Sequence, residues 1–197
     1  MPRGVPNPNI RQDLRAAALR LLLTRGPASL TGRAITREAG CATGALYNHF
    51  ANVNDLLADL VVETLSGQEE QMRGLIARAG SGTVKENLIA AAAQLADEKA
   101  LAMAAVSAAR PEVADLVRNS PAVRAPAFPG LAGSIREYLL AEQRLGRVSA
   151  TTNPDVAATV LIASLHHIML RATDHSREAV RRDLTHVVDL VVDGVHA

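Results

Sequence analysis

The chain has 197 residues and a formal net charge of +1, with 48% hydrophobic, 21% charged and 2% aromatic residues. The single cysteine, Cys41, excludes an internal disulfide, and no apolar run approaches the ~20 residues needed to span a bilayer. The N-terminus also lacks the apolar run of a signal peptide, so we expect a cytoplasmic protein rather than a secreted or membrane-spanning one.

Charge is unevenly distributed along the chain. Residues 1–50 contain seven arginines but only two carboxylates, Asp13 and Glu38, which gives this part a net charge of +5 and leaves the remainder at −4. A basic N-terminal part on an acidic body favours a polyanionic partner for that part alone. A chance fluctuation on a solvated surface would give the same numbers, so charge does not decide the question by itself.

The N-terminal part begins with a proline-containing, flexible arm over residues 1–9, followed by a domain predicted to cover residues 10–52. Apolar residues recur at helical spacing over 10–25, and Gly26 with the following proline ends that helix. The periodicity therefore predicts one amphipathic helix at the start of this domain.

Two shorter helices are predicted to follow. Thr31 is a suitable N-cap for a helix that runs through Ala39, and Gly40 is a natural left-handed stop. A third helix covers roughly 43–50.

The rest of the chain, residues 53–197, is predicted to be a larger helical domain. Its predicted helices cover 53–79, 83–109 with a possible break near Glu98, a shorter stretch from Pro111, 131–145 and two strongly patterned helices at the C-terminus. The proline-rich stretch 119–130 is the best candidate for a mobile loop. Because even the valine-rich ending has helical rather than alternating spacing, we expect an all-α fold.

The stretch from Leu30 to Phe50 has the pattern of a helix-turn-helix, a motif that lays its second helix in the major groove of DNA. Leu46 and Phe50 are four residues apart and share one face, which can pack against Ile35 in a three-helix core. The polar residues of the third helix are thereby left on its outer face.

That outer face offers groups suited to DNA. The Tyr47 hydroxyl suits a phosphate oxygen, Asn48 suits a base edge or a phosphate, and Gly44 lets the backbone approach. His49 is placed to donate to a nearby phosphate, and Thr31 with the free amides of the second helix to hold another. Taken singly, Tyr47 is better explained as a half-buried core residue and His49 as a surface imidazole. Together with the basic N-terminal part they favour DNA binding.

The run from Arg11 to Leu57 resembles, without a gap, the DNA-binding head of the tetracycline-repressor-like (TetR) family of bacterial regulators. The matching residues are Ala18, Leu19, Leu21, Leu22, Gly26, Thr31, Ile35, Ala39, Gly40, Leu46, Tyr47, His49, Phe50, Leu56 and Leu57. The resemblance implies a DNA-contacting surface made of Thr31, Arg33, Ala42, Thr43, Gly44, Tyr47, Asn48 and His49. It further implies that the remaining helices form a dimerising, ligand-responsive body.

Three positions depart from that family's pattern. Ala42 stands where a serine usually caps the recognition helix, a loss of ~1 kcal/mol unless Thr43 replaces it. Val53 stands where a lysine commonly reaches a phosphate. Cys41 replaces a usual valine, and we expect it to fill an apolar site.

The body offers weaker candidates for a ligand pocket and a dimer interface. The pocket candidates are Met103, Arg110, Phe128, Tyr138, Glu142, His166 and Met169. The dimer candidates, on the apolar stripes of the last two helices, are Val160, Ser164, Ile168, Leu184, Val188 and Val191. These stripes could instead serve only the core of the monomer. Adjacent His166 and His167 point about 100° apart on a helix, so we expect no metal site and no other cofactor.

We therefore expect a sequence-specific transcriptional regulator that binds double-stranded operator DNA as a homodimer. In the expected mechanism it is a repressor, released when a small-molecule effector in the body shifts the long helix that joins body to head. The alternatives are a DNA-binding adaptor controlled by a protein partner and, less favoured, a helical enzyme. No phosphate loop, metal-ligand spacing or serine elbow supports the enzyme, so we expect no catalytic residues.

Overall fold

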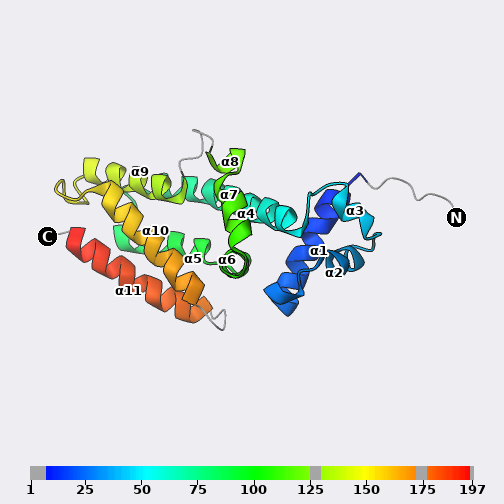
Figure 1. The fold of residues 1–197 in the computed structure, drawn as a ribbon. Coiled ribbons are helices and arrows are strands. Elements are labelled where there is room, and N and C mark those ends of the chain that lie inside the picture. Colours follow the sequence, from blue (N-terminus) through cyan, green and yellow to red (C-terminus); the bar gives the residue numbers. More distant parts are fainter. Residues whose placement is uncertain (1–7, 125–129, 172–176, 196–197) are drawn as a thin grey trace.

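The computed structural model describes residues 8–124, 130–171 and 177–195, and every regular element in these ranges is helical, which confirms the all-α fold. The elements are α1 (Ile10–Arg25), the 3₁₀ turn η1 (Pro27–Ser29), α2 (Gly32–Glu38), α3 (Gly44–Tyr47), α4 (Val53–Ile76), α5 (Val84–Leu95), α6 (Glu98–Ala109), α7 (Pro111–Arg118), α8 (Pro121–Arg124), α9 (Gly130–Arg144), α10 (Pro154–Arg171) and α11 (Arg177–Val195). Figure 1 shows a small head of α1–α3 at one end of an elongated body.

The head has the three predicted helices, but α3 covers only Gly44–Tyr47 where the sequence predicts a helix over roughly 43–50. Gly26 ends α1 with a positive φ of 74°, which favours glycine. The Thr31 side chain accepts a hydrogen bond from the Ala34 amide at 3.2 Å and so caps α2. Gly40, with φ 68°, makes the turn between α2 and α3. Ile35 and Leu46 are fully buried, so the two helices of the motif meet on a common core.

Helix α4 connects the head to the body (Figure 1). It begins where the Asn52 side chain accepts from the Asp55 amide at 3.0 Å. It ends at Ile76, short of the expected Ala79, because the chain turns through Gly80 at a φ of 83°. Its 24 residues therefore reach from the helix-turn-helix deep into the body.

The body agrees with the predicted helices in one place and departs from them in another. The predicted stretch 83–109 divides into α5 and α6, with Asp97 capping the second by accepting from the Ala100 amide at 2.7 Å, which confirms the break near Glu98. The predicted loop 119–130 contains the short helix α8, and its residues 125–129, Phe128 included, lie outside the described ranges.

Two hydrophobic clusters form the core. The head cluster joins α1–α3 to the first half of α4 and continues into α6 and α7 through Met103, Val106 and Val113. The body cluster is formed by the end of α4 with α5, α9, α10 and α11. Helices α6 and α7 thus pack against the head although they come much later in the sequence. Among the described residues no helix is both long and apolar enough to cross a membrane.

Candidate DNA-binding surface and ligand cavity

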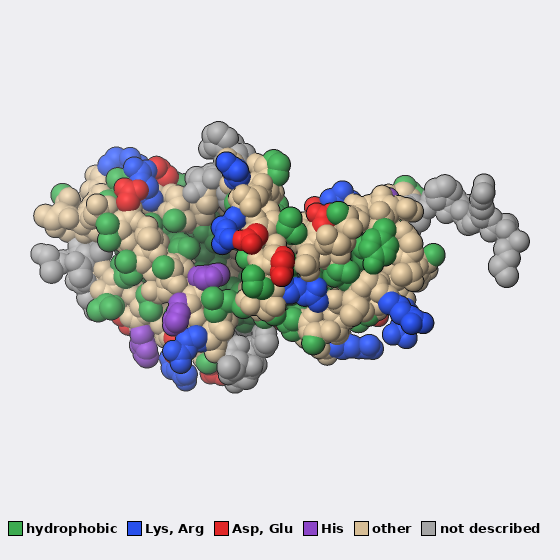
Figure 2. Space-filling model, in the orientation of Figure 1, with side chains coloured by type: hydrophobic (Ala, Val, Ile, Leu, Met, Phe, Trp, Pro, Cys, Tyr) green, Lys and Arg blue, Asp and Glu red, His purple; other side chains and the backbone are tan. Residues whose placement is uncertain are grey.

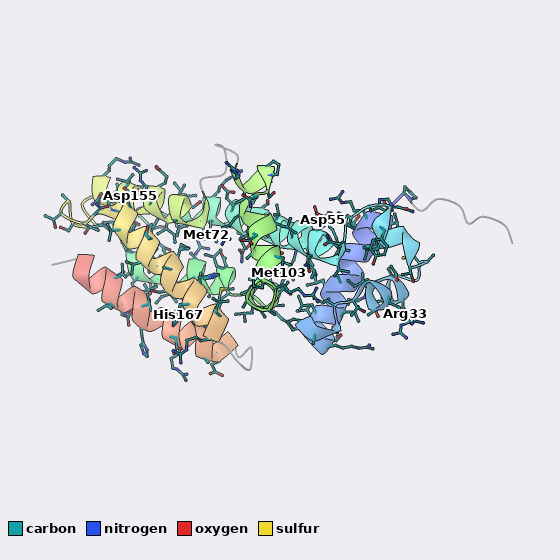
Figure 3. The ribbon with its side chains drawn as sticks, in the orientation of Figure 1. Arg33, Asp55, Met72, Met103, Asp155 and His167 are labelled. Carbon is teal, nitrogen blue, oxygen red and sulfur yellow. The ribbon has the colours of Figure 1, made fainter. Side chains whose placement is uncertain are left out.

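All eight residues expected at DNA are exposed on the head. Tyr47 keeps 57% of its surface accessible although it sits between the buried residues Leu46 and Phe50 of the same segment. Figure 3 shows Arg33 on the side of the head that faces away from the body. This surface is therefore open to a partner as large as a duplex.

Tyr47 lies directly over the start of α2. A Cβ atom added to Gly32 would stand 3.3 Å from the Tyr47 hydroxyl oxygen and 3.5 Å from a Val53 methyl group. Gly32 thus permits the close approach that places the hydroxyl beside Thr31, at the junction of the two helices. Val53 packs on the head cluster at this point, so it extends the apolar contact where the family pattern has a lysine.

The other two departures from the family pattern have different outcomes. Thr43 makes no capping hydrogen bond, so the recognition helix α3 lacks a side-chain cap at its first turn and the suggested replacement of the missing serine does not occur. Cys41 packs against the head cluster, as expected. Burial, and then the nearby Asp13 carboxylate, raise the pKa of its thiol, which keeps it protonated.

The positive charge of the head is partly used within the protein. Arg11 and Arg15 on α1 pair with Asp59 of α4 at 2.8 and 3.2 Å, and Arg20 pairs with Glu38 at 2.9 Å. Within the described ranges, the exposed arginines of the head without an ion pair are Arg25, Arg33 and Arg37. The charge available to DNA is therefore smaller than the sequence alone suggests, and it lies on and next to the helix-turn-helix.

A cavity of about 420 Å³ lies in the body between α4, the end of α5, α6, α7, α9 and α10. It is lined by Val61, Thr64, Leu65, Gln68, Leu95, Ala100, Met103, Ala104, Ser107, Ala108, Ala114, Val117, Arg118, Leu131, Ile162, Leu165, His166, Met169 and Leu170. Figure 2 shows hydrophobic side chains in a hollow between α7 and α10, with histidine at its edge.

Two polar side chains deep in this cavity already make hydrogen bonds within the protein. The Thr64 hydroxyl donates to the Leu60 carbonyl at 2.8 Å, and the Gln68 Nε2 donates to the Leu95 carbonyl at 2.9 Å. The charged or titratable lining residues, Arg118 and His166, are exposed. The cavity is thus apolar inside and polar at its rim.

The structure brings together only part of the predicted pocket. Met103, His166 and Met169 line the cavity, whereas Tyr138 and Glu142 lie near the turn between α4 and α5. The Tyr138 hydroxyl accepts from Asn87 Nδ2 at 3.1 Å, and burial raises the pKa of this phenol. The carboxylate of Glu142 accepts from the Gly80 amide at 3.3 Å and pairs with Arg147. Both residues therefore hold the core together.

The other differences between the predicted and the observed pocket have physical causes. Arg110 reaches away from the cavity toward the head. Gln68 was missed although it offers a signal, since it follows Thr64 and precedes Met72 by four residues on the apolar stripe of α4. Ser107 and Arg118 carry no such signal, because their place at the cavity depends on how α6 and α7 pack.

Some of the predicted dimer residues are buried in the monomer, and others are accessible. Leu184 and Val188 keep only 2% and 1% of their surfaces accessible inside the body cluster, so a second subunit does not reach them. Ile168 and Val191 are half-buried against the same cluster, and Ser164 is half-buried. Val160 is 43% exposed. The exposed apolar residues that the prediction missed on these two helices are Val156, Leu170 and Leu190.

Comparison with known proteins agrees with this architecture. Residues 14–60 match the family model of bacterial regulatory proteins of the tetR family. No curated protein matches the chain.

Three solved structures have the same fold over nearly the whole chain. A TetR-family transcriptional regulator from Mesorhizobium loti is 17% identical, with a TM-score of 0.70 over 98% of this chain and 100% of that one. SmeT, the repressor of the Stenotrophomonas maltophilia multidrug efflux pump SmeDEF, is 20% identical, with a TM-score of 0.69 over 93% and 89%. The regulator FadR from Bacillus subtilis, solved with stearoyl-CoA, is 18% identical, with a TM-score of 0.68 over 94% and 99%.

The structural likeness establishes the fold, and the match over α1–α4 establishes the type of head that it carries. Residues 14–60 therefore match the head of bacterial regulatory proteins of the tetR family, and the chain as a whole has the fold of solved TetR-family regulators.

Proposed function

We propose that the protein is a sequence-specific, DNA-binding transcriptional repressor that leaves its operator when a small apolar molecule occupies the body cavity. The observation that carries this proposal is that the cavity and the hydrophobic cluster of the head have residues in common. Val61, Met103 and Val117 line the cavity and also belong to the hydrophobic cluster that holds the helix-turn-helix. A ligand that touches this wall contacts the core on which the DNA-binding head rests.

The head supplies the DNA contacts. In the proposed complex α3 enters the major groove, where Asn48 reads a base edge and the Tyr47 hydroxyl and His49 bind phosphates. The exposed Arg33 and Arg37 add a sequence-independent attraction to the backbone. The protein then acts where DNA is, in the cytoplasm.

A second copy of the chain completes the DNA-binding unit as a homodimer. Helix-turn-helix proteins commonly bind two half-sites ~34 Å apart through a two-fold axis. The exposed Val156, Val160 and Leu190 place apolar surface on α10 and α11, the pair that would form a four-helix bundle with its copy. The homodimer is thus built from the surface of these helices and not from their buried stripes.

The cavity suits an uncharged, mainly apolar ligand. Its size lies within the range of about 300–1,000 Å³ that small-molecule sites occupy. A charged group buried beside Thr64 and Gln68 would be desolvated away from Arg118 and His166, the exposed charged or titratable lining residues, which is costly. An acidic or polar end is accommodated only at the rim, near Arg118. A cavity of this size favours a small-molecule effector over control by a protein partner.

The ligand would act by contacting the body cluster and the head cluster at the same time. Leu95 and Leu165 of the body cluster face Met103 and Val117 of the head cluster across the same cavity. A molecule between them favours one separation of these walls, and so one position of α4 and the head. It can shift the equilibrium only as far as its affinities for the two positions differ.

The test uses the full chain and a pool of random-sequence duplexes. Repeated selection is expected to enrich one two-fold symmetric sequence, which then reports binding by fluorescence anisotropy. A library of apolar metabolites screened by thermal shift is expected to yield a stabilising compound, and that compound should weaken binding of the selected duplex. Failure to enrich any sequence would overturn the DNA-binding claim. A stabilising compound that leaves the affinity for the duplex unchanged would overturn control through the cavity.

A further inference from the structure

Arg110 joins the ligand-binding part of the body to the helix-turn-helix. Its Nη2 donates to the Leu30 carbonyl at 2.8 Å and its Nη1 donates to Asn54 Oδ1 at 3.0 Å, across 80 and 56 residues of sequence. Both contacts are part-buried. One planar guanidinium, with its donors in a fixed fork, thus holds two separate points of the head.

The two points that Arg110 holds control the position of the recognition unit. The Leu30 carbonyl directly precedes Thr31, the N-cap of α2, and Leu30 itself is only 1% exposed. Asn54 lies in the first turn of α4, two residues after the capping Asn52. Arg110 therefore anchors the starts of α2 and α4, the helices before and after the recognition helix α3.

The other end of Arg110 sits between the helices that form the cavity wall. Its backbone ends α6, where its amide donates to the Val106 carbonyl at 2.9 Å, and starts α7, where its carbonyl accepts from the Val113 amide at 2.9 Å. Both helices line the cavity, α6 through Ser107 and Ala108 among others, and α7 through Ala114 and Val117. A displacement of either helix moves the backbone that carries the guanidinium.

We infer that Arg110 is a positioning residue that transmits the state of the cavity wall to the helix-turn-helix through its bonds to Leu30 and Asn54. The regulatory meaning of this link rests on the proposed function, whereas the link itself does not depend on DNA or on an effector. A ligand that pushes α6 against α7 would strain or break the two hydrogen bonds of Arg110 and so allow the head to move. Release removes the donor from the part-buried Leu30 carbonyl, which makes the bonded and released states distinct.

The first experiment measures hydrogen exchange in the full chain without ligand or DNA. Arg110→Gln is expected to speed exchange of the amides at 32–38 and 54–57 by about tenfold, the factor that a lost hydrogen bond to a charged group implies. The matched control is Arg136→Gln. Arg136 pairs with Asp155 at 2.8 Å within the body and should leave the exchange of the head unchanged. Equal exchange of the head in the two variants would overturn the inference.

The second experiment tests transmission with a side chain in place of a ligand. Ala108 lines the cavity and is exposed, so Ala108→Phe adds bulk to the wall without overpacking the core. It is expected to change exchange at 32–38 several-fold when Arg110 is present and to have no effect there in the Arg110→Gln background. Arg110→Lys, which keeps the charge, should give an intermediate result if Arg110→Gln proves unstable.

Two outcomes of this cycle contradict the inference. Either Ala108→Phe leaves the exchange of the head unchanged in the presence of Arg110, or its effect on the head is equally large without Arg110. Both outcomes are independent of whether the protein selects a DNA sequence or binds an apolar compound, so a failure of the proposed function is seen separately.

Discussion

At the scale of single residues, the contact between Gly32 and Tyr47 is what joins local structure to DNA binding. The Tyr47 side chain is 57% exposed, yet its hydroxyl lies within van der Waals reach of the start of α2. Thr31 and Tyr47 are therefore presented as one surface, although they come from different helices. A Cβ atom at position 32 would require the Tyr47 hydroxyl to shift by a few tenths of an ångström.

Gly32→Ala is expected to weaken DNA binding by about three- to tenfold while leaving the fold intact, because the new Cβ at 3.3 Å moves a phosphate-binding hydroxyl. Thermal unfolding should show no loss of stability, since alanine favours a helix by up to ~1 kcal/mol over glycine. The matched control is Gly67→Ala in α4, where a Cβ meets open space. This control should raise stability and leave affinity for DNA unchanged; equal affinities for the two variants would contradict the assigned role of Tyr47.

At the scale of elements, α3 is the weakest piece of the head. It has four residues and no side-chain cap, and the Ala42 carbonyl accepts from the Ala45 amide at 2.9 Å at its start. A short helix without a cap depends on packing through Leu46 for its order, since isolated helices of this length do not form in water.

Ala42→Ser is expected to stabilise the protein by ~1 kcal/mol, because a serine oxygen at this position can accept from a free amide of the first turn. The gain is measured as a rise in the midpoint of denaturant unfolding, with Ala42→Val as the comparison that adds no acceptor. If the two substitutions changed the midpoint alike, the missing cap would have no bearing on the stability of the head.

The last two helices define the other prediction at this scale. Val160 is 43% exposed on α10, where the proposed dimer needs apolar surface. Val160→Glu is expected to shift the protein from dimer to monomer in sedimentation velocity, because an unpaired charge in an apolar interface is costly. Leu145→Glu, at a residue 55% exposed at the end of α9, is the control and should remain dimeric. A dimer in both variants would place the interface elsewhere.

At the scale of the whole molecule, features that depend on residues close in sequence could be predicted. Features that depend on residues far apart in sequence could not. The head could be predicted because Thr31, Gly40 and Leu46 act through neighbours a few residues away. The cavity could not be predicted, since its walls come from six helices and the sequence does not say which faces of α6 and α7 turn toward α10. Arg110 was assigned to the pocket because an arginine amid apolar residues suggested a ligand contact. Its partners, however, lie 56 and 80 residues away.

The same reasoning explains the error at α11. Leu184 and Val188 lie on a regular apolar stripe, and a stripe alone cannot distinguish the core of a monomer from an interface. Contact with α5 buries this stripe within one chain, so the surface left for a partner is the less regular set that includes Val160 and Leu190.

The most direct test of the central claim compares the affinities of a selected duplex and a scrambled duplex for the wild type, Tyr47→Phe and Asn48→Ala. The wild type is expected to prefer the selected duplex by at least about 10³-fold. Tyr47→Phe should lower both affinities alike, whereas Asn48→Ala should mainly lower affinity for the selected duplex, because only Asn48 reads a base. Equal binding of the two duplexes by the wild type, or unchanged affinities in both variants, would contradict DNA recognition by this face.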